Sequence, residues 1–211
     1  MLLKVKDIFP SMREAMKTSI PEPTLSQPSQ VGNGAFWLTV SKLYFLAAGY
    51  ALFFLLSRIL SPEDFGAYSV VVASVSILNM VFITGTIQAV SKLVSEEPEH
   101  GWLVHRTAMR LQAMAGIGIF LLFNLVAPLL AGFYRDPSLA PYIHISSLIL
   151  LAYCFYGIQV GYINGLRIFP LQAGLDITFS TLKLCGVVGM GALLGLGGAV
   201  GGFAAASLAV L

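Results

Sequence analysis

Charged side chains inside long apolar segments are the residues of this sequence most able to do chemistry. Lys42, Arg58 and Lys183 each lie within or at the end of such a segment. An ionised group at the centre of a bilayer costs at least ~2.5–3.5 kcal/mol, so each of these cations is a candidate for a functional site. Lysine and arginine bind phosphate oxygens through charge-assisted hydrogen bonds. The three side chains are therefore candidate substrate-binding cations, lining a hydrated path for an anionic ligand.

Each of these cations also has a purely structural interpretation. The stem of Lys42 could lift its ammonium to the membrane interface, and Arg58 could be an interfacial anchor. Lys183 could pair with a carboxylate on another helix, but we expect it to face a cavity. Asp176 precedes Lys183 by seven residues, about 10.5 Å along an ideal helix, which is too far for direct contact. We expect Asp176 to cap its helix or to lie at the interface.

Five amide side chains in the apolar segments are candidates for lining the same cavity. They could hydrogen-bond to a polar ligand, or they could form interhelical hydrogen bonds worth about 0.6 kcal/mol each. These residues are Asn79, Gln88, Asn124, Gln159 and Asn164.

Catalytic and metal-binding patterns are not found in the sequence. It has no Walker A motif, no metal-ligand spacing among His100, His105 and His144, and no Ser/His/Asp arrangement in a plausible site. His100 and His105 are expected to be solvated on a charged loop. We therefore predict no enzyme activity, no metal and no cofactor.

The composition indicates what kind of element positions these groups. Of the 211 residues, 57% are hydrophobic and 10% are charged, whereas soluble domains average ~45–50% and ~25%. This composition excludes a soluble enzyme. The net charge of +2 is too small and too scattered for a nucleic-acid-binding surface.

Long apolar segments predict an all-α, polytopic transmembrane helix bundle, because every backbone amide in lipid must be bonded internally. The last segment would be only about 22 Å long, short of a ~30 Å hydrocarbon core, so we expect a truncated sixth span. Residues 1–35 are expected to form a partly disordered polar tail, and residues 36–211 the bundle. The predicted spans are 36–59, 68–90, 109–133, 142–163, 177–196 and 197–211.

The distribution of basic residues predicts the orientation. Eight Lys and Arg residues fall in the tail and in the connections on its side, against Arg58 and Arg135 on the other side. The positive-inside rule then places the N-terminus in the cytoplasm.

Glycines at four-residue spacing predict faces where helices approach closely. They form four sets, which are Gly157, Gly161 and Gly165; Gly191 and Gly195; Gly197 and Gly201; and Gly198 and Gly202.

The connection after the first span reads RILSPEDFGAYSVV, with Ser61 as a helix N-cap and Pro62 at the first helical position. The RILSPEDFGAY part resembles the first-loop signature of the polysaccharide biosynthesis proteins. These are lipid-linked oligosaccharide flippases of the multidrug/oligosaccharidyl-lipid/polysaccharide exporter superfamily. SKLV at 91–94 and GYINGLRIFPLQA at 161–173 are similar to the family at corresponding positions, and the similarity runs from about Phe36 to Leu211.

The resemblance implies a transporter of two helical lobes that open alternately, of which this sequence is similar to the N-terminal lobe. The implied cargo is an undecaprenyl-diphosphate glycan, such as an O-antigen or exopolysaccharide unit, carried across the plasma (inner) membrane. The implied partners are the bilayer, the lipid-linked oligosaccharide, and a missing C-terminal lobe or a second copy.

Two other functions stay open at this stage. One is a cation-coupled small-molecule exporter of the same superfamily, which should place more acidic residues in its cavity than Asp176. The other is a non-transporting scaffold of a glycan-assembly complex.

Overall fold

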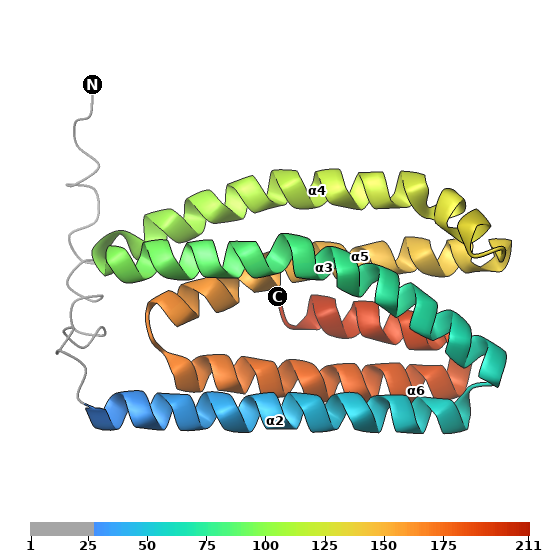
Figure 1. The fold of residues 1–211 in the computed structure, drawn as a ribbon, viewed down its shortest axis with the longest axis horizontal. Helices are drawn as coiled ribbons and strands as arrows, with labels where there is room; N and C mark the ends of the chain where they lie inside the picture. The colour runs from blue at the N-terminus through green and yellow to red at the C-terminus, as the bar shows by residue number, and fades with distance from the viewer. Residues whose placement is uncertain (1–27) are drawn as a thin grey trace.

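The computed structural model describes residues 28–211, so most of the predicted tail lies outside the described residues. In this range the chain forms long helices joined by short turns, with no strand. The elements are α2 (Pro28–Ile59), α3 (Pro62–Glu96), the 3₁₀ turn η1 (Pro98–His100), α4 (Gly101–Phe133), the 3₁₀ turn η2 (Pro137–Leu139), α5 (Ala140–Gly165) and α6 (Phe169–Ala209) (Figure 1). Five of the helices are long and apolar enough to cross a membrane. The predicted all-α helical bundle is confirmed.

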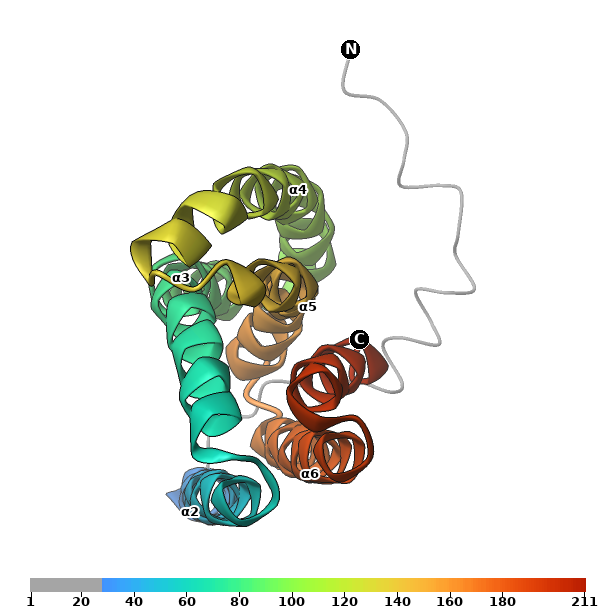
Figure 2. The same ribbon diagram turned by 90° about the vertical axis from the view of Figure 1, so that its right-hand side faces the viewer.

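The helix α6 contains both of the last two predicted segments. Gly195 has φ +64° and ψ −144°, and this non-helical residue divides the helix into two arms. The arms lie side by side and run in opposite directions, so the chain turns back on itself (Figures 1 and 2). Only glycine adopts this backbone conformation at little cost. The predicted boundary between residues 196 and 197 is therefore one to two residues late.

The helix α5 lies at the centre of the bundle. It packs against α3, α4 and α6, whereas α2 packs mainly along α6 (Figure 2). The largest core side chains with almost no exposed surface include Leu56 on α2, Tyr68 on α3 and Ile143 on α5. Because α2 has few contacts with the other helices, its position depends mainly on α6.

Glycines on α5 explain how closely it approaches α3. A Cβ on Gly157 would come within 2.8 Å of Ile83, and one on Gly161 within 3.0 Å of the Ile87 carbonyl. A Cβ on Gly165, the third member of this set, would come closer still to Val94. The predicted packing face is confirmed, because the backbone of α5 lies directly against α3 at these glycines.

The two arms of α6 approach each other through another predicted set. Gly202 lies against the backbone carbonyl of Gly186, and Gly191 lies beside Ala199. In contrast, a Cβ on Gly201 would meet nothing within 4 Å. Packing between the arms therefore uses the set that contains Gly202. In the set of Gly197 and Gly201, only Gly197 lies at a packing face, since its Cβ would lie 3.5 Å from Tyr142 on α5.

The helices α3 and α4 extend beyond the predicted spans. They contain 35 and 33 residues, or about 50 Å each at 1.5 Å per residue, against ~30 Å of hydrocarbon. The expected charged loop between residues 91 and 108 is therefore mostly helical, with only Glu97 and the turn η1 between the two helices. The helices continue through this polar sequence because their backbone N–H to C=O hydrogen bonds form whether the side chains are polar or apolar. His105 consequently lies in α4.

The turn between α2 and α3 has the predicted cap. Ser61 is the N-cap of α3, its Oγ accepts a hydrogen bond from the backbone N–H of Asp64 at 3.1 Å, and Pro62 is the first helical residue.

We expect Ser61→Ala to lower the free energy of unfolding by about 1 kcal/mol, because an orphan N–H of α3 loses its acceptor. Thermal unfolding in detergent measures the change. Ser57→Ala is the matched control, since the Ser57 hydroxyl donates only to the Phe54 carbonyl within α2 and should change stability by less than about 0.5 kcal/mol. Equal effects of the two substitutions would contradict the capping role.

Candidate functional site

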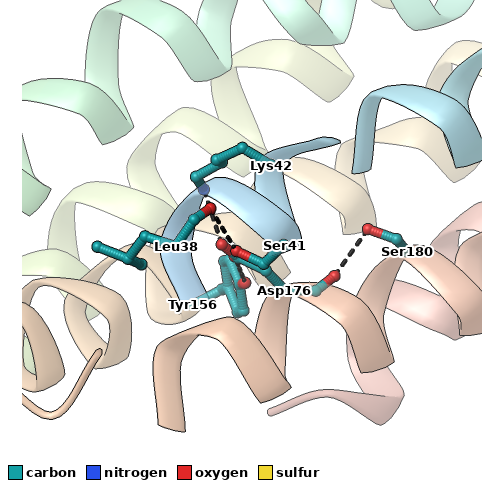
Figure 3. Close-up of polar contacts among 6 residues, drawn as sticks. All are labelled: Leu38, Ser41, Lys42, Tyr156, Asp176 and Ser180. Carbon is teal, nitrogen blue, oxygen red and sulfur yellow. Dashed lines mark hydrogen bonds and ion pairs between the residues drawn. The ribbon is translucent and has the colours of Figure 1, made fainter. Parts of the chain in front are cut away.

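A polar cluster joins three helices in the apolar bundle (Figure 3). The ammonium Nζ of Lys42 on α2 lies 2.7 Å from Oδ2 of Asp176 on α6. The hydroxyl of Tyr156 on α5 donates to the other carboxylate oxygen at 2.8 Å. The Ser180 hydroxyl donates to the backbone carbonyl of Asp176 at 2.7 Å. We call Lys42, Tyr156, Asp176 and Ser180 the polar cluster.

The start of α6 determines the position of Asp176. This helix begins at Phe169, seven residues before Asp176, so the prediction that Asp176 caps the helix was wrong. Asp176 is buried, with 8% of its side chain exposed. A buried carboxylate needs a cation and hydrogen-bond donors, and the polar cluster supplies both.

Lys42 forms an ion pair with a carboxylate on another helix, which is the contact that the sequence left open for Lys183. The neighbour of Lys42, Ser41, is fully buried and donates to the Leu38 carbonyl at 2.9 Å. Lys42 stands at the edge of the same interface, with 61% of its side chain exposed and its ammonium turned to Asp176. The pair spans 134 residues of sequence and ties α2 to α6. A second side-chain link between these helices joins the Tyr44 and Thr181 hydroxyls at 2.8 Å.

Lys183 lines a hollow between α2 and α6. The empty space there, counted together with the open space at its mouth, is about 260 Å³, and the other lining residues are Phe45, Ala48, Gly49, Leu52 and Ser180. The ammonium of Lys183 lies 4.1 Å from the ring centroid of Phe203, on the C-terminal arm of α6. A cation over an aromatic face is attracted by the ring quadrupole. In residues 28–211 this ammonium makes no ion pair with a carboxylate.

The hollow and the polar cluster share one interface. Ser180 lines the hollow and also bonds to the backbone of Asp176. Lys42 and Lys183 therefore lie along the same α2–α6 interface, whereas Arg58 does not join them. Arg58 is sixteen residues beyond Lys42, about 24 Å along the helix. Its guanidinium lies over its own neighbour Phe54, at 5.3 Å from the ring centroid.

Two of the five predicted amides link α4 to α5. The Asn124 amide nitrogen donates to the Ser147 hydroxyl at 2.8 Å, and its oxygen lies 2.8 Å from Nδ1 of His144. Gln159 Oε1 lies 3.2 Å from Nε2 of His105. These contacts are the interhelical bonds that the sequence left open as an alternative.

The remaining amides lie elsewhere in the described chain. Asn79 is half-buried on α3 with its Oδ1 unbonded, Gln88 is exposed on α3, and Asn164 is in the last turn of α5. None of the five predicted amides is among the residues that line the hollow.

Sequence reasoning missed four residues of these sites, which are His105, Tyr156, Ser180 and Phe203. His105 was wrongly expected to be solvated: its ring lies 4.8 Å from that of Tyr162, centroid to centroid, and it bonds to Gln159. Tyr156 and Phe203 lie in apolar segments where an aromatic residue looks like ordinary core. The one available signal was the four-residue spacing of Asp176 and Ser180, which puts them on one helix face.

The described residues contain no group of three or more His, Cys, Asp or Glu side chains that could hold a metal ion. The described residues form a bundle of long helices, in which the buried carboxylate of Asp176 lies between α2, α5 and α6. Such a chain is a multi-pass membrane protein.

The protein belongs to the polysaccharide biosynthesis protein family, because the model of that family matches residues 31–211. Membership implies a role in polysaccharide biosynthesis, and members are generally transporters rather than enzymes. Comparison with curated proteins and with solved structures gave no match.

Proposed function

We propose that this protein takes part in moving a lipid-linked oligosaccharide across the plasma (inner) membrane by alternating access. The single observation that carries the proposal is Lys183, whose side chain lines a mostly apolar hollow and whose ammonium lies over the ring of Phe203. A cation held in this way is costly unless it has an anionic ligand to bind. The diphosphate of a polyprenyl-linked glycan is such a ligand, and Lys42 adds a second cation to the same interface.

The size of the hollow limits which part of the cargo it takes. The hollow is small and partly open, whereas most small-molecule pockets have volumes of ~300–1,000 Å³. It therefore accommodates a phosphate group rather than a glycan. In this proposal the sugars and the polyprenyl tail lie outside it, along the exposed face of α2.

The proposal includes a cytoplasmic N-terminus, supported by the excess of basic residues on that side. It also includes a second helical bundle, either a C-terminal lobe or a second copy, facing the α2–α6 interface. The exposed aromatic side chains of α2 support this arrangement, since Tyr50 and Phe54 are 72% and 60% exposed.

The alternatives account for the cluster less well. A cation-coupled exporter needs a carboxylate free to bind its ion, but Asp176 is already paired with Lys42. A scaffold does not need a lysine in an apolar hollow. Transport of an anionic cargo is the function that uses both lysines.

Lys183→Met tests the proposal in cells whose surface polysaccharide depends on this protein. We expect surface glycan to fall at least tenfold at unchanged membrane abundance, because the cargo loses a cation that binds its diphosphate. Lys183→Arg should restore much of the display because it keeps the charge. Lys92→Met is the matched control, since it removes an exposed lysine at the end of α3. Full display by Lys183→Met at normal abundance would refute the role of this residue.

A further inference from the structure

The two partners of the ion pair in the polar cluster differ in accessibility. The side chain of Lys42 is 61% exposed, whereas that of Asp176 is 8% exposed. A lysine ammonium has three N–H donors, and Asp176 Oδ2 takes one of them. An anion arriving on the exposed side of α2 therefore reaches the ammonium but not the carboxylate.

The two partners also differ in freedom to move. Asp176 has a short side chain on the buried face of α6, and the Tyr156 hydroxyl holds its second oxygen at 2.8 Å. Ser180 anchors the backbone of the same residue. Lys42 has a flexible four-carbon stem and no other side-chain bond among the described residues. If the pair separates, the lysine moves and the carboxylate stays with Tyr156.

From this asymmetry we infer that Asp176 is a resting counter-ion, which occupies Lys42 until a phosphate-bearing lipid headgroup takes its place. The step is an exchange of ion pairs, in which no covalent bond forms or breaks. The identity of the headgroup as cargo rests on the proposed function, whereas the exchange itself rests on the geometry of the polar cluster.

The exchange has a consequence for α2. This helix packs mainly along α6, and two side-chain hydrogen bonds join them, the Lys42–Asp176 pair and the Tyr44–Thr181 pair. Headgroup binding removes the charged link and leaves the neutral one. Binding of the cargo is thereby coupled to a weaker hold on α2.

Asp176→Asn tests the exchange, because asparagine keeps the shape and still accepts from Tyr156 but does not hold an ammonium as an ion pair. The full chain is placed in phosphatidylcholine nanodiscs, and calorimetry measures the affinity for inorganic pyrophosphate and for farnesyl diphosphate. We expect the affinity of the variant for both probes to rise at least tenfold. If Asp176 only supported the structure, or positioned Lys42 for the ligand, the affinity would fall.

Two controls separate the exchange from general electrostatics. Glu96→Gln removes one negative charge from the exposed Lys92–Glu96 pair and should leave both affinities unchanged. Lys42→Met in the Asp176→Asn background should abolish the gain. An equal gain in Glu96→Gln, or a gain that persists without Lys42, overturns the inference. So does an unchanged or reduced affinity in folded Asp176→Asn.

Tyr156→Phe provides a test of opposite sign if Asp176→Asn does not fold. Without the Tyr156 hydroxyl, Asp176 depends on Lys42 as its one side-chain partner in the described cluster. The pair should hold more tightly, and the affinity for both probes should fall about threefold. An increase would overturn the exchange.

The two probes distinguish the sources of the phosphate. A gain with farnesyl diphosphate supports exchange with a lipid headgroup, whereas a gain confined to pyrophosphate overturns the lipid assignment. The outcome is also independent of the glycan-display experiment. If the gain is seen while Lys183→Met retains full display, the proposed function fails and the exchange stands; the reverse pattern removes the exchange alone.

Discussion

Replacing Lys42 with methionine is expected to lower the free energy of unfolding by about 3 kcal/mol, at the low end of the range for breaking a buried ion pair. The cost arises at Asp176, which stays buried and loses its counter-ion. Tyr156 continues to donate to the carboxylate and limits the loss. Thermal unfolding in detergent, calibrated against denaturant unfolding, measures the change.

The reciprocal substitution is the control for this prediction. Asp176→Asn leaves the exposed Lys42 without an ion-pair partner, and water can solvate its ammonium, so a cost of about 1 kcal/mol is expected. The double variant should be more stable than Lys42→Met alone. If Lys42→Met and Asp176→Asn lowered the free energy of unfolding equally, the burial of Asp176 would not explain the predicted difference.

Gly202→Ala is the second substitution for which a large effect is expected. Its Cβ would collide with the backbone carbonyl of Gly186, and backbone cannot give way as a flexible side chain does. We expect a loss of about 3 kcal/mol, the upper range for overpacking, because the two arms of α6 must separate. The separation also moves Phe203 away from Lys183. Unfolding experiments and a distance measurement between spin labels on the two arms monitor both effects.

The neighbouring glycine provides a matched control for this experiment. A Cβ on Gly201 meets nothing within 4 Å, so Gly201→Ala should be neutral or should stabilise the helix by up to about 1 kcal/mol. A similar loss in both variants would mean that contact with the Gly186 carbonyl does not set the effect.

The apolar segments of the sequence were sufficient to predict most of the fold. Long runs of apolar residues specify helices because lipid leaves no other partner for the backbone. The prediction was wrong where composition changes but helical hydrogen bonding continues, as between residues 91 and 108 and at the start of α6. The turn at Gly195 was placed nearly correctly. Sequence alone did not separate this glycine from its neighbours, since only the backbone conformation distinguishes it.

The candidate site was less predictable than the fold. Spacing within one helix correctly indicated that Asp176 and Lys183 form no ion pair, but it carried no information about α2. The partner of Asp176 is 134 residues away, and which helices pack together decides that contact. Tyr156 was missed for the same reason: an aromatic side chain in an apolar segment shows its polar function only when a carboxylate lies beside it.

The long α3–α4 hairpin has a practical consequence for imaging. Both helices are longer than the ~30 Å hydrocarbon of a bilayer, and they are joined only through Glu97 and the short turn η1. A soluble helical protein inserted in register at this turn would be held rigidly, because no flexible linker would intervene. The hairpin thus provides a site for a fiducial mass, with which electron cryomicroscopy could align particles of a 22.6 kDa chain that is otherwise hidden in its detergent micelle.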